Sequence, residues 1–291
     1  MAQPSHMPVG VSGRAVEAAA SRTADAENFP VGSWLLPRRL RRHIALYYAF
    51  ARAADDIADD PDRAAERKVA ELDAMDAALS GAKAATSPAS AKAVRLAASL
   101  AETGVPIAHG AELLRAFRQD ATKLRYTDWA ELMDYCRYSA APVGRYLLDL
   151  HGESRATWGP SDALCASLQV LNHIQDCRAD YQRLDRVYLP LDAFAAAGAA
   201  VGDLDRPAAS PELRAVLDRC LDGCEALNRE ARALPGLIRD RRMRMEAAVI
   251  VQIAHRLCAL LRGADPLARR IELGPAGKLA CLAAGVWTAL R

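Results

Sequence analysis

Residues 47–60 have the sequence YYAFARAADDIADD, an apolar, alanine-rich run that ends in acidic residues. No glycine or proline interrupts the run before Pro61, so the stretch is predicted to be helical. With 3.6 residues per turn, one face of this helix carries an aromatic ring, a guanidinium and carboxylates, contributed by Tyr48, Arg52, Asp55, Asp56 and Asp59. Such a row does not serve a hydrophobic core. We interpret it as one wall of a functional site.

The composition of the remaining chain favours an all-α fold. Of the 291 residues, 52% are hydrophobic and only 5% aromatic, and long segments lack the alternating β-branched pattern of strands. Further helices are expected over residues 64–79, 91–103, 107–122, 128–150, 161–181, 211–233 and 238–262, with Pro142 kinking or interrupting the fourth of these. Since no repeat or loss of helical character marks a boundary, we expect a disordered segment over 1–26 and one helical domain over 27–291.

Charge and cysteine content exclude several classes of function. With 38 basic and 36 acidic residues, the net charge of +2 gives no basis for nucleic-acid binding. The seven cysteines are scattered and form no C-x-x-C pair, which indicates reduced thiols in a cytoplasmic protein. The first 26 residues lack a signal-peptide core, and the apolar tract at 279–290 is too short to cross a bilayer. Peripheral contact with the inner face of a membrane is left open.

A second polar row follows the same helical geometry. Gln169, Asn172, Asp176 and Asp180 lie at offsets that place them on one face, and Leu168 and Ile174 are among their apolar neighbours. Two solvated acidic faces would cost only a few tenths of a kcal/mol per like-charged pair, and this interpretation is the alternative to a site. Two buried carboxylates about 6 Å apart repel by roughly 3 kcal/mol at an effective dielectric near 20, so burial would demand a cation.

The ligand types in these rows favour Mg²⁺ bound together with a diphosphate. Carboxylates without a histidine or cysteine partner are hard oxygen ligands, and Mg²⁺ completes its shell with water and phosphate. Arg52 lies one turn before the acids and would repel a bare ion, so we expect it to face the diphosphate anion. His173 is expected to be a hydrogen-bonded core or supporting residue rather than a base, and Cys177 a packing residue.

Together the two rows resemble motifs of the squalene/phytoene synthase family over roughly residues 28–190. The row from Tyr48 to Asp59 is similar to the first aspartate-rich motif of the family. The row from Gln169 to Asp180, followed by Arg186-Val187-Tyr188, is similar to the second. Between them, the segment from Tyr135 to Gly144 resembles the substrate-channel helix. The resemblance implies an all-α isoprenoid synthase fold with its helices around a central apolar cavity, and Mg²⁺-dependent chemistry on a prenyl diphosphate.

The resemblance also implies roles for individual residues. Metal binding is expected from Asp55, Asp59, Asp176 and Asp180. Substrate binding is expected from Asn28, Arg52, Gln169, Asn172, Arg186 and Tyr188. Catalytic roles are expected for Tyr48, Arg52, Asp56, Tyr135 and Asn172.

Within the family, residues 28–31, 35–41 and 139–144 are most similar to the hopanoid-associated hydroxysqualene synthases. This subgroup implies presqualene diphosphate as substrate, hydroxysqualene as product and water as the final nucleophile. One alternative is a head-to-head synthase that condenses two farnesyl diphosphates to a squalene- or phytoene-type product. Another, of a different class, is a catalytically silent member that acts as an assembly factor; that alternative expects eroded acids, and both rows are intact.

Overall fold

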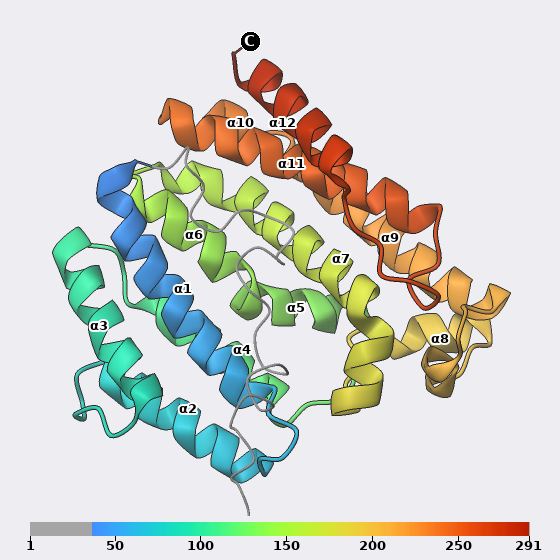
Figure 1. Cartoon of the computed structure of the whole chain (residues 1–291), viewed down its shortest axis with the longest axis horizontal. Coiled ribbons are helices and arrows are strands. Elements are labelled where there is room, and N and C mark those ends of the chain that lie inside the picture. The colour runs from blue at the N-terminus through green and yellow to red at the C-terminus, as the bar shows by residue number, and fades with distance from the viewer. Residues whose placement is uncertain (1–36, 291) are drawn as a thin grey trace, which may run out of the picture.

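The computed structural model describes residues 37–290, and this part of the chain is helical (Figure 1). The α-helices are α1 (Arg38–Ala58), α2 (Ala65–Leu79), α3 (Pro88–Thr103), α4 (Ala108–Asp120), α5 (Trp129–Ser139), α6 (Ala141–Leu150), α7 (Trp158–Leu184), α8 (Leu191–Ala197), α9 (Pro211–Ala231), α10 (Leu234–Leu237), α11 (Arg241–Arg262) and α12 (Pro275–Leu290). Short 3₁₀ turns, η2 (Arg155–Thr157) and η3 (Val201–Asp205), complete the described elements. The predicted all-α fold is confirmed. The predicted disordered segment 1–26 lies outside the described residues.

Pro142 divides the predicted helix over 128–150 into α5 and α6. The chain bends at Ala140, whose φ of −117° and ψ of −48° leave the regular helical range. Pro142 then sits in the first turn of α6, where its missing N–H would have had no partner within the helix. The predicted interruption is confirmed, and it gives Tyr135 on α5 and Gly144 on α6 different helix axes.

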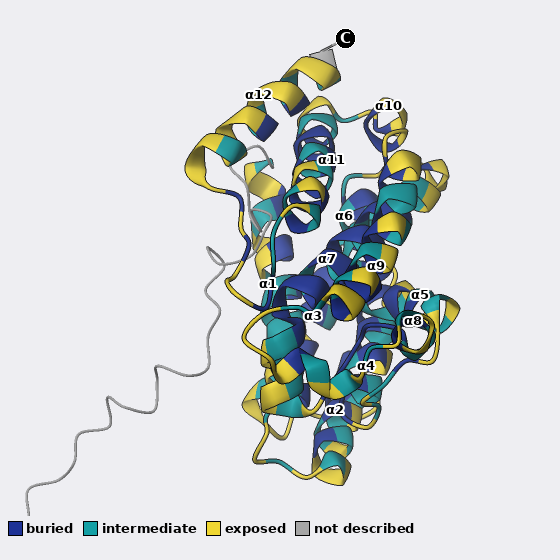
Figure 2. Ribbon diagram, turned by 90° about the vertical axis from the view of Figure 1, so that its right-hand side faces the viewer, coloured by how far each residue is buried: buried dark blue, intermediate teal, exposed yellow. Residues whose placement is uncertain are grey.

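The described helices pack around two large hydrophobic clusters, and a small third cluster lies between α11 and α12. Helices α1 to α4 enclose one cluster, in which Phe50 and Leu114 are fully buried. The second lies among α5 to α11 and includes Leu171 and Leu257, also fully buried. Helix α7 crosses the middle of the molecule, with α6 and α9 against it, and is among its most buried elements (Figure 2). Arg186, just after α7, donates to the last carbonyls of α1 and α4, those of Ala58 and Asp120, so the ends of these three helices lie near one another.

A short backbone bridge joins the segment after α4 to the segment after α7. Arg125 and Val187 form an isolated parallel bridge, and the Val187 amide donates to the Leu124 carbonyl at 2.9 Å. The chain reaches this position because Asp185 ends α7 in the left-handed region, with φ +49°, a conformation that aspartate tolerates better than most residues. As a result, residues 120–126 and 186–188 lie together.

Helix α12 packs closely on α11 through a glycine. A Cβ atom built on Gly285 would lie 2.6 Å from both the backbone nitrogen and Cα of Val249. Since backbone atoms cannot rotate away, Gly285→Ala should separate the helices and lower the free energy of unfolding by about 1–3 kcal/mol. Urea denaturation measures this loss. Gly159→Ala is the matched control, because nothing lies within 4 Å of a Cβ there, and equal stability of the two variants would contradict the packing.

Among the helices within residues 37–290, none is both long and apolar enough to cross a bilayer.

Candidate active site

The first predicted row lies on the last turns of α1 and on the residue that follows it. Tyr48, Arg52, Asp55 and Asp59 are half-buried, whereas Asp56 is exposed. The Arg52 guanidinium contacts Asp55 at 3.1 Å and Asp56 at 3.0 Å. Arg52 therefore pairs with the acids of its own row, and its predicted contact with a diphosphate stays a prediction. An incoming anion would have to draw the guanidinium away from these carboxylates.

The second predicted row lies along α7. Asp176 is buried, and Gln169, Asn172 and Asp180 are half-buried. Asp176 accepts a hydrogen bond of 2.6 Å from Arg270, in the segment between α11 and α12. The Gln175 side chain donates to the Ile271 carbonyl of the same segment, which fixes this part of the chain against α7. Arg270 was not predicted as a site residue.

Arg186 connects the ends of the two rows. Its side chain is only 5% exposed and donates to Asp59 at 2.8 Å, to Tyr188 Oη at 3.2 Å and to the Asp120 carbonyl at 2.8 Å. It also reaches the Ala58 carbonyl at 3.4 Å, and Lys68 Nζ donates to that same carbonyl at 3.0 Å. Both cations face the carboxyl end of α1, where the helix dipole favours positive charge. Arg186 thus holds Asp59, the last acid of the first row, beside the segment that follows the second.

Electrostatic repulsion within the first row favours a bound cation. Desolvation and the neighbouring Asp59 carboxylate raise the pKa of Asp55 to about 7, although Arg52 opposes the shift. The charged form of this pair is therefore costly without a counter-ion. Carboxylates of this kind fit Mg²⁺, which prefers oxygen ligands.

The carboxylates do not form a ready-made metal cage. Across residues 37–290, no three histidine, cysteine, aspartate or glutamate side chains lie close enough together to hold a metal ion. Mg²⁺ accepts such sparse ligation because it keeps several waters and takes oxygens from a substrate phosphate. The donor set therefore fits a metal that arrives with a diphosphate better than a metal held by protein alone.

A cluster of aromatic rings stands beside the second row. His173 stacks on Tyr188 with ring centroids 3.5 Å apart, and Tyr135 lies 5.3 Å from Tyr188. Gln169 hydrogen-bonds His173 at 3.2 Å. His173 is buried and partnered, as expected of a supporting residue. Cys177 is buried too, and burial raises the pKa of its thiol to about 12, so it is unreactive.

Asp120, which was not predicted from the sequence, hydrogen-bonds two tyrosines of this aromatic cluster. It is the last residue of α4, 5% exposed, and accepts hydrogen bonds of 2.8 Å from Tyr135 and from Tyr188. One signal could have drawn attention to it, because an acid at the carboxyl end of a helix opposes the helix dipole. Arg270 offered no comparable signal.

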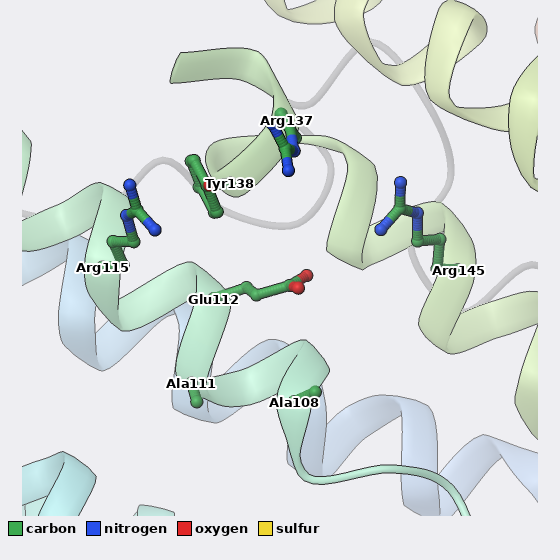
Figure 3. A pocket seen from close by; sticks show the side chains of 7 residues that line it. All are labelled: Ala108, Ala111, Glu112, Arg115, Arg137, Tyr138 and Arg145. Atoms are coloured by element: carbon green, nitrogen blue, oxygen red, sulfur yellow. The ribbon is translucent and has the colours of Figure 1, made fainter. Parts of the chain in front are cut away.

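A cavity of about 500 Å³ lies at another place in the fold, between α4, α5 and α6 (Figure 3). Its lining includes Arg115, Arg137 and Arg145, with the Glu112 carboxylate directed into it, and Arg115 lies 3.8 Å above the Tyr138 ring. None of the predicted site residues lines this cavity.

Of the predicted site residues, Asn28 lies outside the described part of the chain.

Several known proteins are similar to this chain over most of its length. A family model described as squalene/phytoene synthase matches residues 23–276. The hydroxysqualene synthase of Rhodopseudomonas palustris is 47% identical over 261 residues, which cover 90% of this chain and 88% of that protein. A phytoene synthase of Mycobacterium tuberculosis is 34% identical over 276 residues, 91% of this chain and 88% of that protein. The crystal structure of squalene synthase HpnC from Alicyclobacillus acidocaldarius aligns with a TM-score of 0.69 and 33% identity, covering 80% of this chain and 87% of that chain.

Proposed function

Because the chain belongs to the squalene/phytoene synthase family, as its two acidic rows predicted, we propose that it converts presqualene diphosphate to hydroxysqualene with loss of diphosphate. The chain is an enzyme of this family. One observation carries the choice of reaction: the hydroxysqualene synthase relative is considerably more similar to this chain than the phytoene synthase, over nearly the same length.

The acidic rows would hold Mg²⁺ in this reaction. Asp55 and Asp59 would contribute from α1, and Asp176 and Asp180 from α7. When bound, Mg²⁺ would stabilise the negative charge of the departing diphosphate as a Lewis acid.

The cationic side chains would bind the diphosphate. Arg52 and Arg186 now pair with carboxylates of the first row, and both could turn toward phosphate oxygens once those carboxylates bind metal. Gln169, Asn172 and Tyr188 would complete the polar contacts with substrate. Tyr48 and Tyr135 would border the reacting carbons, where an aromatic face can stabilise a carbocation.

The raised pKa of Asp55 predicts a pH-dependent affinity for Mg²⁺. Below pH 7 the metal must displace a proton from this carboxyl, so the apparent affinity measured with inorganic diphosphate should fall by up to about tenfold per pH unit. Calorimetric titration between pH 5.5 and 8 measures the trend. In Asp55→Asn the affinity should be lower throughout, and this part of its pH dependence should disappear. The comparison cancels the protonation of diphosphate itself, so identical pH profiles would contradict the prediction.

A substrate comparison tests the proposed reaction. The purified protein with Mg²⁺ is incubated with presqualene diphosphate or with farnesyl diphosphate, and the products are identified by mass spectrometry. We expect hydroxysqualene from the first and no condensation of the second. Turnover of farnesyl diphosphate alone would instead support the head-to-head synthase. No turnover of either would favour a catalytically silent member of the family.

The outer face of α12 supports peripheral contact with a membrane, which would suit an apolar product. Leu279 and Trp287 are 65% and 61% exposed, and Lys278 is the single charged residue in the helix sequence. Figure 2 shows this helix at the edge of the molecule with much of its outer surface exposed. Apolar and aromatic side chains on such a face insert at the boundary between headgroups and acyl chains.

A further inference from the structure

Asp120 uses both of its carboxylate oxygens on tyrosine hydroxyls. Oδ2 accepts from Tyr135 Oη and Oδ1 accepts from Tyr188 Oη, each at 2.8 Å. All three side chains are buried, with exposures of 5% for Asp120, 2% for Tyr135 and 7% for Tyr188. A buried carboxylate is costly unless it is well hydrogen-bonded, so this arrangement is not incidental to packing.

The arrangement fixes the direction of the hydroxyl protons. An ionised carboxylate has no hydrogen to give, and each tyrosine hydroxyl has one, so both hydrogens must point toward Asp120. Any further hydrogen bond to either phenol oxygen must therefore be donated to it. Burial raises the pKa of Asp120 to about 6, while Arg186 and the two tyrosine hydrogen bonds oppose the shift. Asp120 is consequently ionised at neutral pH, but it takes up a proton more readily than an ordinary aspartate.

The two tyrosines are not equivalent. The Tyr188 oxygen already accepts a hydrogen bond of 3.2 Å from Arg186, whose positive charge disfavours a second proton at that oxygen. Among the described residues, no lysine or arginine donates to the Tyr135 oxygen, and the Tyr135 ring lies 6.1 Å from that of His173 on α7, the helix that carries the second polar row. Of the pair, Tyr135 is the better route for a proton to reach Asp120.

We propose that Asp120 is a positioning residue and proton acceptor that acts through Tyr135 in the step where water captures the carbocation. The inference rests on the proposed function, in which the bond from carbon to the diphosphate oxygen breaks and its electron pair leaves with diphosphate. The water oxygen then forms the new bond to carbon. One water proton passes to the Tyr135 oxygen as the Tyr135 hydroxyl proton moves to Asp120 Oδ2. The products are the alcohol, free diphosphate and a neutral Asp120, which later releases its proton to solvent.

The product ratio tests this proposal more directly than the overall rate. Asp120→Asn preserves the shape of the side chain, but its amide cannot take up the proton. We expect the rate of hydroxysqualene formation from presqualene diphosphate to fall by about 10²-fold, and the rate of diphosphate release to fall much less. The carbocation should then lose a proton elsewhere and give hydrocarbon products in place of the alcohol. Release of diphosphate and the alcohol fraction are measured in the same reaction.

Tyr135→Phe should produce the same change in the alcohol fraction, because it removes the same route. The double variant, Asp120→Asn with Tyr135→Phe, should be no worse than either single variant, since both act on one step. Asp149→Asn is the matched control. Asp149 is also a largely buried acid, hydrogen-bonded to His109 at 2.8 Å and outside the proposed site, so its variant can lose stability without changing the alcohol fraction.

The outcomes separate the possible failures. An unchanged alcohol fraction in Asp120→Asn, or effects of the two substitutions that multiply in the double variant, would overturn the role of Asp120. If Asp120→Asn does not fold, Tyr135→Phe decides alone, and an unchanged alcohol fraction there also overturns it. Wild-type protein that forms no hydroxysqualene would refute the proposed function itself, which is a different result.

Discussion

Asp55→Ala combined with Asp176→Ala should lower the rate of diphosphate release by about 10³-fold or more. The double variant removes one predicted metal ligand from each acidic row, and charge stabilisation of a leaving group commonly contributes 10²- to 10³-fold at a single position. Release of diphosphate from presqualene diphosphate at saturating Mg²⁺ measures the loss. Stability should change far less than activity, because the substitution also relieves repulsion between Asp55 and Asp59.

The control for this experiment removes two acids that lie outside the rows. Asp62 and Asp134 are both exposed, so Asp62→Ala combined with Asp134→Ala subtracts the same charge without touching the site. This variant should retain activity. Unchanged product formation in the Asp55 and Asp176 double variant would refute the metal site, whatever the control shows.

Arg186→Met should lower the free energy of unfolding by about 3–5 kcal/mol, a cost typical of removing one partner from a buried ion pair. Methionine fills similar space but removes the buried donor to Asp59 and to the Asp120 carbonyl, whereas the Ala58 carbonyl keeps its hydrogen bond from Lys68. Urea denaturation of the metal-free protein at pH 7 measures the change.

Arg183→Met provides the comparison, because Arg183 is exposed and forms an ion pair with the same Asp59 carboxylate. Its nitrogen lies 3.5 Å from Asp59, and its side chain is 54% exposed, against 5% for Arg186. An exposed pair of this kind contributes up to about 1 kcal/mol. If the two variants were equally stable, burial would not be the source of the contribution of Arg186.

The fold and both acidic rows could be predicted from sequence because they depend on local periodicity. A spacing of three and four residues aligns Tyr48 with Arg52 and Asn172 with Asp176 on any helix, whatever lies opposite. Pro142 likewise interrupts its helix through its own ring. These features need no information about distant parts of the chain.

The partners of the rows could not be predicted, because they come from segments far away in sequence. Arg270 reaches Asp176 across 94 residues, and Asp120 accepts from Tyr188 across 68. Arg52, in contrast, pairs with Asp55 and Asp56 three and four residues away on its own helix, a pairing that its spacing allows. Its predicted contact with a diphosphate stays a prediction.

The bridge between Arg125 and Val187 has a consequence for the order of folding. The contacts of Asp120 with Tyr188, and of Arg186 with Asp59 across 127 residues, close long loops whose entropy must be overcome before the contacts form. Local helices can form much earlier. We therefore expect the hydrogen bonds of Asp120 and Arg186 to form after the helices that carry them. A complete site would then report that segments far apart in the sequence have come together.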